Sequence, residues 1–283
     1  MSKFPEMTLL GQNELVRLDR WELERRSRAL ATAVYLGDKT ALCRILGRYK
    51  MFVSTADVGF GAHVMLDGLW ESWLTVFMAS HVKTGMNVVD AGANHGYYTL
   101  LFSDLVGPKG KVAAFEPNPP IAQLLKQSVA VNGFSSHATV YEKALVAEED
   151  VTLTFYAEDA EPKNARVVGA ELAAHDRTVQ VQGSRLDSVL AHWPRVDFMK
   201  VDVEGAEEAM IEGSSAILER DRPKLVLEFS AVRCKAPEKL LDYLNSLYGA
   251  PKMINFEAKL VPVTTEALLD RSNHEDWLLF YAP

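Results

Sequence analysis

The sequence predicts an α/β fold, a doubly wound and mainly parallel sheet with helices on both faces. Two observations carry this prediction. From Met86 onward, short β-rich runs alternate with helical patterns over about 200 residues, which is typical of βαβ units. In addition, 48% of the 283 residues are hydrophobic and 24% are charged, ordinary values for a globular chain that needs no disulfide or metal to fold.

The expected strands are short and recur along this part of the chain. In chain order they are Asn87–Asp90, Lys111–Glu116, Thr139–Val146, Val196–Val203, Lys224–Ser230, Lys252–Phe256 and Asp276–Tyr281. Between the third and the fourth, the alternating segments Val151–Tyr156 and Thr178–Gln182 predict an added antiparallel pair. No linker separates a further domain, so we expect one α/β domain over residues 81–283.

Helical patterns fill the spaces between the strands. A helix is expected from Tyr97, and Asn118 is placed to cap a second helix that ends at Asn132 and Gly133. A further helix is expected from Pro237 to Tyr248. Because the strands of βαβ units are parallel, their carboxyl ends should share one edge of the sheet, where ligands bind.

Residues 1–80 precede the first strand and are predicted to form a mainly helical extension. The segment from Asn13 to about Leu46 is rich in Leu, Ala, Arg and Glu, and Gly37 and Gly47 are breakers. Asn13 can cap a helix with apolar positions that include Leu15, Leu18, Trp21, Leu30, Ala33 and Val34. Met51–Val53 predicts a short strand, and Trp70–His81 predicts the helix that leads into the sheet.

Charge and cysteine content narrow the class of protein. Lys and Arg number 30 against 38 Asp and Glu, and the net charge of -8 argues against a nucleic-acid partner. The two cysteines, Cys43 and Cys234, form no metal-binding pattern and indicate a reducing compartment. No signal peptide and no bilayer-spanning apolar stretch is visible, so we expect a cytoplasmic protein without membrane contacts.

Acids and glycines follow the first two expected strands. Asp90, Gly92 and Gly96 form the pattern Asp-x-Gly-x-x-x-Gly, which is neither the GxGxxG dinucleotide motif nor a phosphate-binding P-loop. An acid before the loop disfavours a pyrophosphate and suits a cationic ligand. Glu116 ends the second strand, where a carboxylate can accept both hydroxyls of a ribose. Together these acids predict S-adenosylmethionine, which has a ribose, an amino group and a sulfonium but no phosphate.

Four segments resemble a known family: VVDAGANHGYYTLLF, FEPNP, DFMKVDVEGAE and PKLVLEF. Over about residues 65–281 the chain resembles the FkbM family of class I S-adenosylmethionine-dependent methyltransferases. The resemblance implies a Rossmann-like sheet of seven strands in the order 3-2-1-4-5-7-6, with the last strand antiparallel. It also implies O-methylation of hydroxyls on sugars, polyketides and other secondary metabolites. His95 departs from the pattern, since the family more often has an aliphatic residue there.

The predicted cofactor site draws on the ends of four strands. The end of the third strand is expected to lie against the adenine, and Tyr97 opens the helix beside the glycine loop. The predicted cofactor-binding residues are Asp90, Gly92, Ala93, Asn94, His95, Gly96, Tyr97, Glu116, Asn118, Lys143, Ala144 and Asp202.

Three carboxylates, Asp202, Glu204 and Glu228, are the predicted catalytic residues. Lys200, Asp202 and Glu204 share one strand face by alternation, and such charges on a buried strand are costly unless paired or functional. The structural alternative is a Lys200–Asp202 ion pair with Glu204 near a helix N-terminus. A hydroxyl acceptor must lose a proton as it attacks, which any of the three carboxylates could remove.

The predicted function is therefore methyl transfer from S-adenosylmethionine to a small-molecule acceptor, with a hydroxyl favoured. Residues 1–80 and the segment Val151–Gln182 are expected to shape the acceptor pocket, and residues 1–80 could instead form a homo-oligomer contact. An NAD-binding oxidoreductase and a non-catalytic cofactor-binding module are the alternatives. No spacing among the carboxylates demands a metal, so none is predicted, although their oxygens would suit Mg²⁺.

Overall fold

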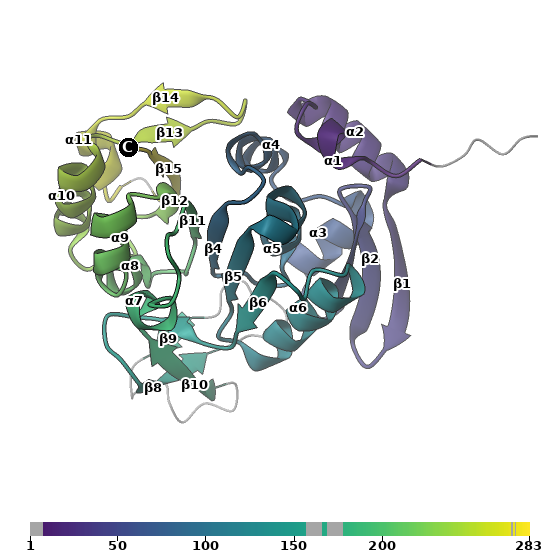
Figure 1. The fold of residues 1–283 in the computed structure, drawn as a ribbon, viewed down its shortest axis with the longest axis horizontal. Helices are drawn as coiled ribbons and strands as arrows, with labels where there is room; N and C mark the ends of the chain where they lie inside the picture. Colours follow the sequence, from purple (N-terminus) through teal and green to yellow (C-terminus); the bar gives the residue numbers. More distant parts are fainter. Residues whose placement is uncertain (1–7, 157–165, 169–177, 273, 275) are drawn as a thin grey trace, which may run out of the picture.

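The centre of the molecule is an eight-stranded sheet (Figure 1). The structure is a computed structural model that describes residues 8–156, 166–168, 178–272, 274 and 276–283. The strand order is β14-β13-β15-β12-β11-β4-β5-β6. In that order the strands are Leu260–Pro262, Lys252–Ile254, Trp277–Tyr281, Lys224–Phe229, Phe198–Val201, Asn87–Ala91, Lys111–Phe115 and Ala138–Tyr141.

This order confirms the expected 3-2-1-4-5-7-6 arrangement, counted along the chain from β4. The strands β6, β5, β4, β11 and β12 are parallel, whereas β15 is antiparallel to both of its neighbours. The sheet has one strand more than predicted. After β13 the chain turns back between Asn255 and Lys259, and β14 pairs with β13 as an additional edge strand.

Helices cover both faces of this sheet (Figure 1). In the described part of the chain, none of them is both long and apolar enough to cross a lipid bilayer. The helices are α1 Gln12–Leu15, α2 Arg20–Leu30, α3 Phe60–Asp67, α4 Ser72–His81, α5 Tyr97–Val106, α6 Pro119–Val131, α7 Leu186–Val189, α8 Glu207–Glu212, α9 Ser215–Asp221, α10 Pro237–Tyr248 and α11 Thr265–Leu269, with a 3-10 turn at Gly107–Lys109.

Alternation along each strand sorts the side chains onto the two faces. In β4, Val88 belongs to one buried cluster and Val89 to the other, and in β11 Phe198 and Met199 divide in the same way. The first cluster includes α4, α5 and α6, and the second includes α7 to α11. Both faces of the sheet are therefore buried, as a parallel sheet requires.

A smaller sheet lies beside the main one, in the order β7-β10-β8-β9. Its strands in that order are Ala144–Leu145, Thr178–Ser184, Val151–Tyr156 and Arg166–Val168. The predicted antiparallel pair is confirmed as β8 and β10. The expected third strand, Thr139–Val146, is corrected, because β6 ends at Tyr141 and Ala144–Leu145 pairs with β10 instead. Residues 157–165 and 169–177 of the insertion lie outside the described residues.

The N-terminal region differs most from the prediction. The single helix expected from Asn13 is wrong, because α1 ends at Leu15, α2 ends at Leu30, and Ala33 and Val34 lie in a strand. Three antiparallel strands follow α2, and they form a separate sheet. These strands are β1 Thr32–Gly37, β2 Thr40–Ile45 and β3 Tyr49–Ser54.

A tight turn explains why the chain forms a hairpin here. Asp38 and Lys39 both have positive φ angles, and such a two-residue turn matches the twist of paired strands. The β-branched and aromatic residues of β1 favour a strand, and this preference prevails over the helical spacing of Ala33 and Val34. The short strand expected at Met51–Val53 is confirmed within β3.

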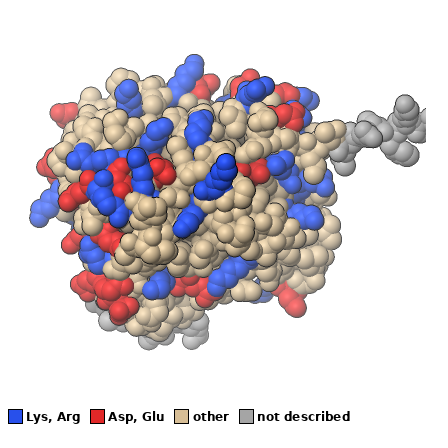
Figure 2. Space-filling model, viewed as in Figure 1, with Lys and Arg blue, Asp and Glu red and all other residues tan. Residues whose placement is uncertain are grey.

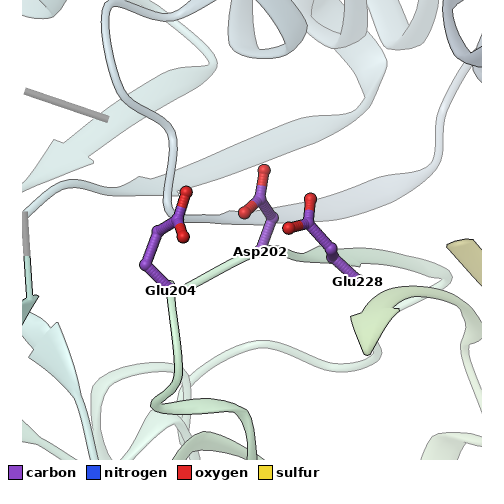
Figure 3. A group of neighbouring side chains, drawn as sticks. All are labelled: Asp202, Glu204 and Glu228. Atoms are coloured by element: carbon purple, nitrogen blue, oxygen red, sulfur yellow. The ribbon is translucent and has the colours of Figure 1, made fainter. Parts of the chain in front are cut away.

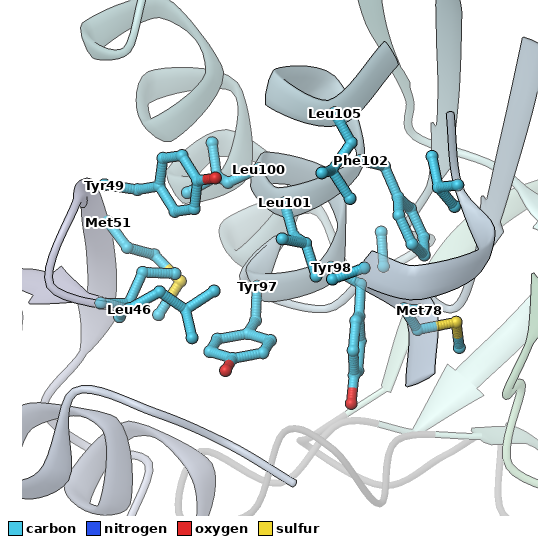
Figure 4. Close-up of a cluster of buried hydrophobic side chains, with 14 of the residues drawn as sticks. Leu46, Tyr49, Met51, Met78, Tyr97, Tyr98, Leu100, Leu101, Phe102 and Leu105 are labelled. Atoms are coloured by element: carbon cyan, nitrogen blue, oxygen red, sulfur yellow. The ribbon is translucent and has the colours of Figure 1, made fainter. Parts of the chain in front are cut away.

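The N-terminal sheet is part of the main hydrophobic core. Leu46, Tyr49 and Met51 belong to one buried cluster with Leu100 and Leu101 of α5 (Figure 4). The expected extension is therefore packed into the α/β fold, since the two parts share buried apolar surface.

One polar joint fastens β3 to α5. Asp104 of α5 accepts from Arg48 Nε at 2.8 Å and from Arg48 Nη2 at 3.2 Å. It also accepts from the hydroxyl of Tyr49 at 2.9 Å. The Asp104 side chain is only 14% exposed, so this joint is shielded from competing water.

Charges on the outer surface are mixed. Figure 2 shows Lys, Arg, Asp and Glu interspersed over one face of the molecule, and they form no continuous basic stripe on that face. The charge pattern of this face therefore singles out no binding surface on it.

Replacing Asp104 tests the joint between the N-terminal sheet and α5. Asp104→Ala leaves Arg48 and Tyr49 without their charged acceptor, and we expect a loss of about 1.5–3 kcal/mol in the free energy of unfolding. Urea unfolding near neutral pH measures it. Asp242→Ala, at an exposed position of α10, is the matched control and should change stability by less than about 0.5 kcal/mol. Equal effects of the two substitutions would contradict the structural role of Asp104.

Candidate functional site

A cavity of about 520 Å³ opens at the carboxyl ends of the central strands. Small-molecule sites typically measure about 300–1,000 Å³. Asn94 follows β4, Glu116 follows β5, Asp202 follows β11, and Glu228 lies near the end of β12. This is the edge of an open α/β sheet where ligands bind, so the cavity is the candidate site.

The loop after β4 is pressed against the end of β11. Gly92 has a φ angle of +74°, and a Cβ atom there would lie 1.7 Å from the carbonyl oxygen of Asp202. Gly96 has a φ angle of +97°, and a Cβ atom there would lie 2.1 Å from Leu125 Cδ1. Only glycine fits the first position, because main-chain atoms cannot move aside. The close approach places the loop and Asp202 on one wall of the cavity.

Glu116 presents its carboxylate to the cavity and is fixed by two main-chain donors. The N–H of Asn94 donates to Oε2 at 2.8 Å, and the N–H of Asn118 donates to Oε1 at 2.8 Å. Burial raises the pKa of Glu116 to about 7, although the two hydrogen bonds oppose this shift. The remaining lone pairs can accept hydrogen bonds from ligand hydroxyl groups.

Eight of the predicted cofactor-binding residues line the cavity, and their role stays a prediction. They are Gly92, Ala93, Asn94, Tyr97, Glu116, Lys143, Ala144 and Asp202. Lys143 donates to Ser184 Oγ at 2.7 Å, which holds the β6–β7 connection against β10.

The other four predicted residues, Asp90, His95, Gly96 and Asn118, do not line the cavity. The structure places these four behind the cavity wall, and their role in cofactor binding stays a prediction. Asp90 is fully buried, and its Oδ2 accepts from Thr99 Oγ1 at 2.6 Å. His95 is also fully buried, and Asn118 reaches the site only through its N–H bond to Glu116.

The three predicted catalytic carboxylates converge on one end of the cavity (Figure 3). One carboxylate oxygen from each of Asp202, Glu204 and Glu228 lies within 4.8 Å of the others. Arg233, in the loop after β12, donates to Glu204 at 2.7 Å and to Glu228 at 2.8 Å. It also pairs with Asp276 at 2.9 Å. One guanidinium thus holds three acids together.

Lys200 holds the remaining carboxylate from inside the sheet. Its ammonium donates to Asp202 Oδ2 at 3.0 Å and lies 5.3 Å from the ring centroid of Tyr98. Burial would lower the pKa of Lys200, but the charges of Asp202 and Asp90 raise it above its ordinary value. The side chain therefore stays an ammonium. The ion pair of the structural alternative is present, and Asp202 nevertheless lines the cavity.

Glu204 and Glu228 have raised pKa values. Burial raises the pKa of Glu204 to about 7, with a further contribution from Asp202, while Arg233 opposes the shift. Burial also raises the pKa of Glu228, and the charge of Asp202 adds to it. A general base works best with a pKa near the working pH, so the pKa of Glu204 suits it to proton transfer.

Aromatic side chains from outside the central parallel strands form another part of the cavity wall. Phe60, Trp70 and Trp73 come from the N-terminal region, and Phe256 and Trp277 come from the C-terminal strands and their turn. The rings of Trp73 and Phe256 meet edge to face at 4.9 Å. Segments from the two ends of the chain therefore meet at this wall.

Sequence reasoning missed three charged residues of the site, Arg233, Glu71 and Asp276. Arg233 lies in a loop, and no periodic pattern relates it to Glu228 five residues earlier. Glu71 has a φ angle of +39° just before α4 and accepts from the hydroxyl of Tyr98 at 2.9 Å. The only available signal was a lone charge beside an expected strand end or helix start, which is too common to single out a site residue.

The strand order, the glycine loop and the acid after the second strand together define a Rossmann-like methyltransferase fold. Comparison with known families agrees, because residues 90–249 match the methyltransferase FkbM domain. This segment is more than half of the 283 residues, and the chain belongs to the FkbM methyltransferase family. Family membership favours a methyltransferase over the NAD-binding oxidoreductase.

Two curated fungal proteins are similar to part of the chain. Methyltransferase sdnD of Sordaria araneosa is 31% identical over 157 residues, covering 44% of this chain and 59% of that protein. Methyltransferase 1 of Beauveria bassiana is 31% identical over 148 residues, covering 44% of this chain and 57% of that protein. The chain thus spans less than two thirds of the length of these relatives.

The chain is also similar to solved structures that are more distant in sequence. Methyltransferase FkbM from Methylobacillus flagellatus is 19% identical with a TM-score of 0.46, over 70% of this chain and 44% of that chain. A SAM-dependent O-methyltransferase from Thermotoga maritima is 15% identical with a TM-score of 0.40, over 75% of this chain and 64% of that chain.

Replacing Arg233 should destabilise the protein more as the pH rises. Arg233 opposes the upward pKa shifts of Glu204 and Glu228, so Arg233→Met raises both pKa values further. When folding raises the pKa of a carboxyl group, the free energy of unfolding falls as the pH rises from the pKa of the unfolded state to that of the folded state. We therefore expect a loss of about 1–3 kcal/mol near pH 8 and a smaller loss near pH 5.5, measured by urea unfolding.

Arg25→Met is the control for this experiment. Arg25 pairs with Glu22 on the exposed surface of α2, at 2.6 Å. Its removal should have little effect at either pH, because water screens the exposed pair. If Arg233→Met lowers the free energy of unfolding by the same amount at both pH values, the electrostatic role assigned to Arg233 is contradicted.

Proposed function

We propose that this protein is an S-adenosylmethionine-dependent methyltransferase that methylates a hydroxyl of a small acceptor, a sugar or a secondary metabolite. The observation that carries the proposal is Glu116, a buried carboxylate at the second strand end with lone pairs open to the cavity. Family membership supports methyl transfer. The choice of a hydroxyl rests on the family resemblance and on the carboxylates beside the cavity.

The chemistry of the cavity wall fits this cofactor. Glu116 is placed to accept hydrogen bonds from the two ribose hydroxyls, and Gly92 leaves no side chain between the loop and β11. The wall carries more carboxylates than cations, which suits a ligand with an ammonium and a sulfonium. When bound, the cofactor supplies an electrophilic methyl group whose transfer leaves a neutral thioether.

The residues of this chain then have to orient the acceptor and remove its proton. Asp202 is the first candidate for the base, because Lys200 fixes its orientation and its side chain is 30% exposed at the cavity. Glu204 is the competing candidate, since burial brings its pKa to about 7. Glu228 lies at the neighbouring strand end and is the third.

A Mg²⁺ ion bound by the three carboxylates would be a different way to activate a hydroxyl. The carboxylate oxygens are close enough together for one ion. Arg233, however, already provides the positive charge that Glu204 and Glu228 face. We therefore propose proton transfer by a carboxylate without a metal, which the assay below tests with EDTA.

We further propose that the N-terminal region covers the acceptor side of the cavity. It contributes Phe60, Trp70, Glu71 and Trp73 to the wall, and aromatic faces suit the apolar faces of ring-shaped acceptors. By contrast, none of the described residues of the segment Val151–Gln182 lines the cavity. The expectation that this insertion shapes the acceptor pocket has no support from its described residues.

Replacing Glu116 tests the cofactor. Glu116→Ala removes two charge-assisted hydrogen bonds, so S-adenosylhomocysteine should bind about 10- to 150-fold more weakly in calorimetry. In the wild type, affinity should increase from about pH 6 to about pH 8, because the pKa of Glu116 is about 7 and the ionised form accepts both hydroxyls. Glu142→Ala, an exposed site outside the cavity, is the control. Tight binding of NAD without any binding of S-adenosylhomocysteine would refute the proposed cofactor.

Replacing the carboxylates one at a time identifies the base. Asp202→Asn should lower kcat by about 10²- to 10⁴-fold and change the affinity for S-adenosylmethionine much less, because it keeps the shape and removes the proton acceptor. The assay measures release of S-adenosylhomocysteine with a library of hydroxylated acceptors. Turnover also distinguishes an enzyme from a cofactor-binding protein without activity.

Glu204→Gln and Glu228→Gln are the matched variants in the same assay. A single-turnover rate of Asp202→Asn within about threefold of the wild type would exclude Asp202 as the base, given the much larger loss expected for a base. The variant with the largest loss would then identify it. Loss of wild-type activity in EDTA and its recovery with Mg²⁺ would instead favour the metal.

A further inference from the structure

His95 is fully buried between the glycine loop and the N-terminal sheet. The family resemblance leads us to expect an aliphatic residue here, and the mechanism above does not use the side chain. Its ring stacks on Phe60 of α3, with centroids 5.3 Å apart and ring planes 18° apart. Phe60 lines the cavity, so His95 touches a residue of the aromatic wall from behind.

Three hydrogen bonds in sequence link the N-terminal sheet to Glu116, and two of them involve the His95 side chain. The N–H of Ser54, the last residue of β3, donates to His95 Nε2 at 3.2 Å. Because Nε2 accepts, the neutral ring carries its proton on Nδ1, which donates to Asn94 Oδ1 at 2.7 Å. The N–H of Asn94 in turn donates to Glu116 Oε2 at 2.8 Å. The N-terminal sheet is thereby linked to the carboxylate assigned to the ribose.

The surroundings of His95 keep its ring neutral and hold Asn94 in an uncommon conformation. Burial lowers the pKa of His95 to about 3, so Nε2 remains an acceptor near neutral pH. Asn94 has a φ angle of +49°, and its Oδ1 also accepts from the main-chain N–H of His95 at 2.9 Å. The ring therefore helps to fix the residue whose N–H orients Glu116.

We propose that His95 is a positioning residue that couples the N-terminal sheet to the cofactor side of the cavity. On one side, its hydrogen bond to Asn94 helps to orient Glu116. On the other side, it contacts Ser54 of the N-terminal sheet and Phe60 of the aromatic wall. A ligand that holds Glu116 therefore also tightens the end of β3. This inference rests on the proposed function, because it requires a cofactor at Glu116. A leucine could still pack on Phe60, but it would leave the Ser54 N–H without its acceptor.

The wild-type protein provides the first test. Nuclear magnetic resonance of the imidazole nitrogens should show the Nδ1–H tautomer of His95 near neutral pH. Saturating S-adenosylhomocysteine should slow hydrogen exchange of the Ser54 amide by about 5- to 150-fold, a typical coupling between two sites. The amide of Val181, in the small sheet, should exchange at an unchanged rate. These readouts need no variant and report on the link itself.

His95→Leu provides the second test. It should bind S-adenosylhomocysteine about 3- to 10-fold more weakly, as expected for a lost hydrogen bond, and should lose the ligand-dependent slowing at Ser54. His137→Leu is the control. His137 is half-buried, and its Nε2 lies 2.9 Å from the Ser103 carbonyl oxygen, outside the cavity. It should retain both the affinity and the slowing.

The outcomes separate this inference from the proposed function. An Nε2–H tautomer, or Ser54 exchange that does not respond while S-adenosylhomocysteine binds the wild type, would overturn the role of His95 alone. Failure of the wild type to bind S-adenosylhomocysteine would overturn the proposed function, and this inference with it. If His95→Leu does not fold, the tautomer of His95 and the exchange rate of the Ser54 amide in the wild type still test the proposed role of His95.

Discussion

A buried ammonium lies at the centre of the sheet, and the site is built around it. Lys200 is 4% exposed, stands in register with Asp90 on the neighbouring strand and donates to Asp202. A buried charge is costly unless it is paired, so the acids at the ends of β4 and β11 are structural requirements as well as candidates for chemistry. Gly92 permits these two strand ends to approach, because any side chain there would collide with the Asp202 carbonyl.

The negative charge of the cavity follows from the same arrangement. Alternation along the strands places four charged residues on the sheet face that packs against α4 to α6, namely Asp90, Glu116, Lys200 and Glu228. Burial on this face disfavours the ionised form of the carboxyl groups. Six carboxylate side chains line the cavity, and three cationic side chains do so. The carboxylates are Glu71, Glu116, Asp202, Glu204, Glu228 and Asp276, and the cations are Lys143, Lys200 and Arg233. This excess of carboxyl groups supports the proposed cationic cofactor.

The family resemblance implied the order of seven of the eight strands, and the strand patterns placed the acids Asp90, Glu116, Asp202 and Glu228 at strand ends. Glu116 and Asp202 could be placed because period-two alternation and parallel strands together fix which side chains reach one edge. The N-terminal hairpin was missed because Ala33 and Val34 fit a helical spacing. In addition, the turn at Asp38 and Lys39 requires positive φ angles, and these two residues do not form a common turn motif. Arg233 was missed because only tertiary structure brings its loop back over the strand ends.

The two halves of the cavity have different origins in the chain. The segment that matches the family, residues 90–249, contains the glycine loop, the acid after β5 and the three clustered carboxylates. The aromatic wall comes from Phe60, Trp70 and Trp73 before it and from Phe256 and Trp277 after it. The proposed acceptor wall is therefore built outside the segment that matches the family, by segments such as Trp70–His81 and Asp276–Tyr281, whose type the sequence predicted but whose contacts it could not.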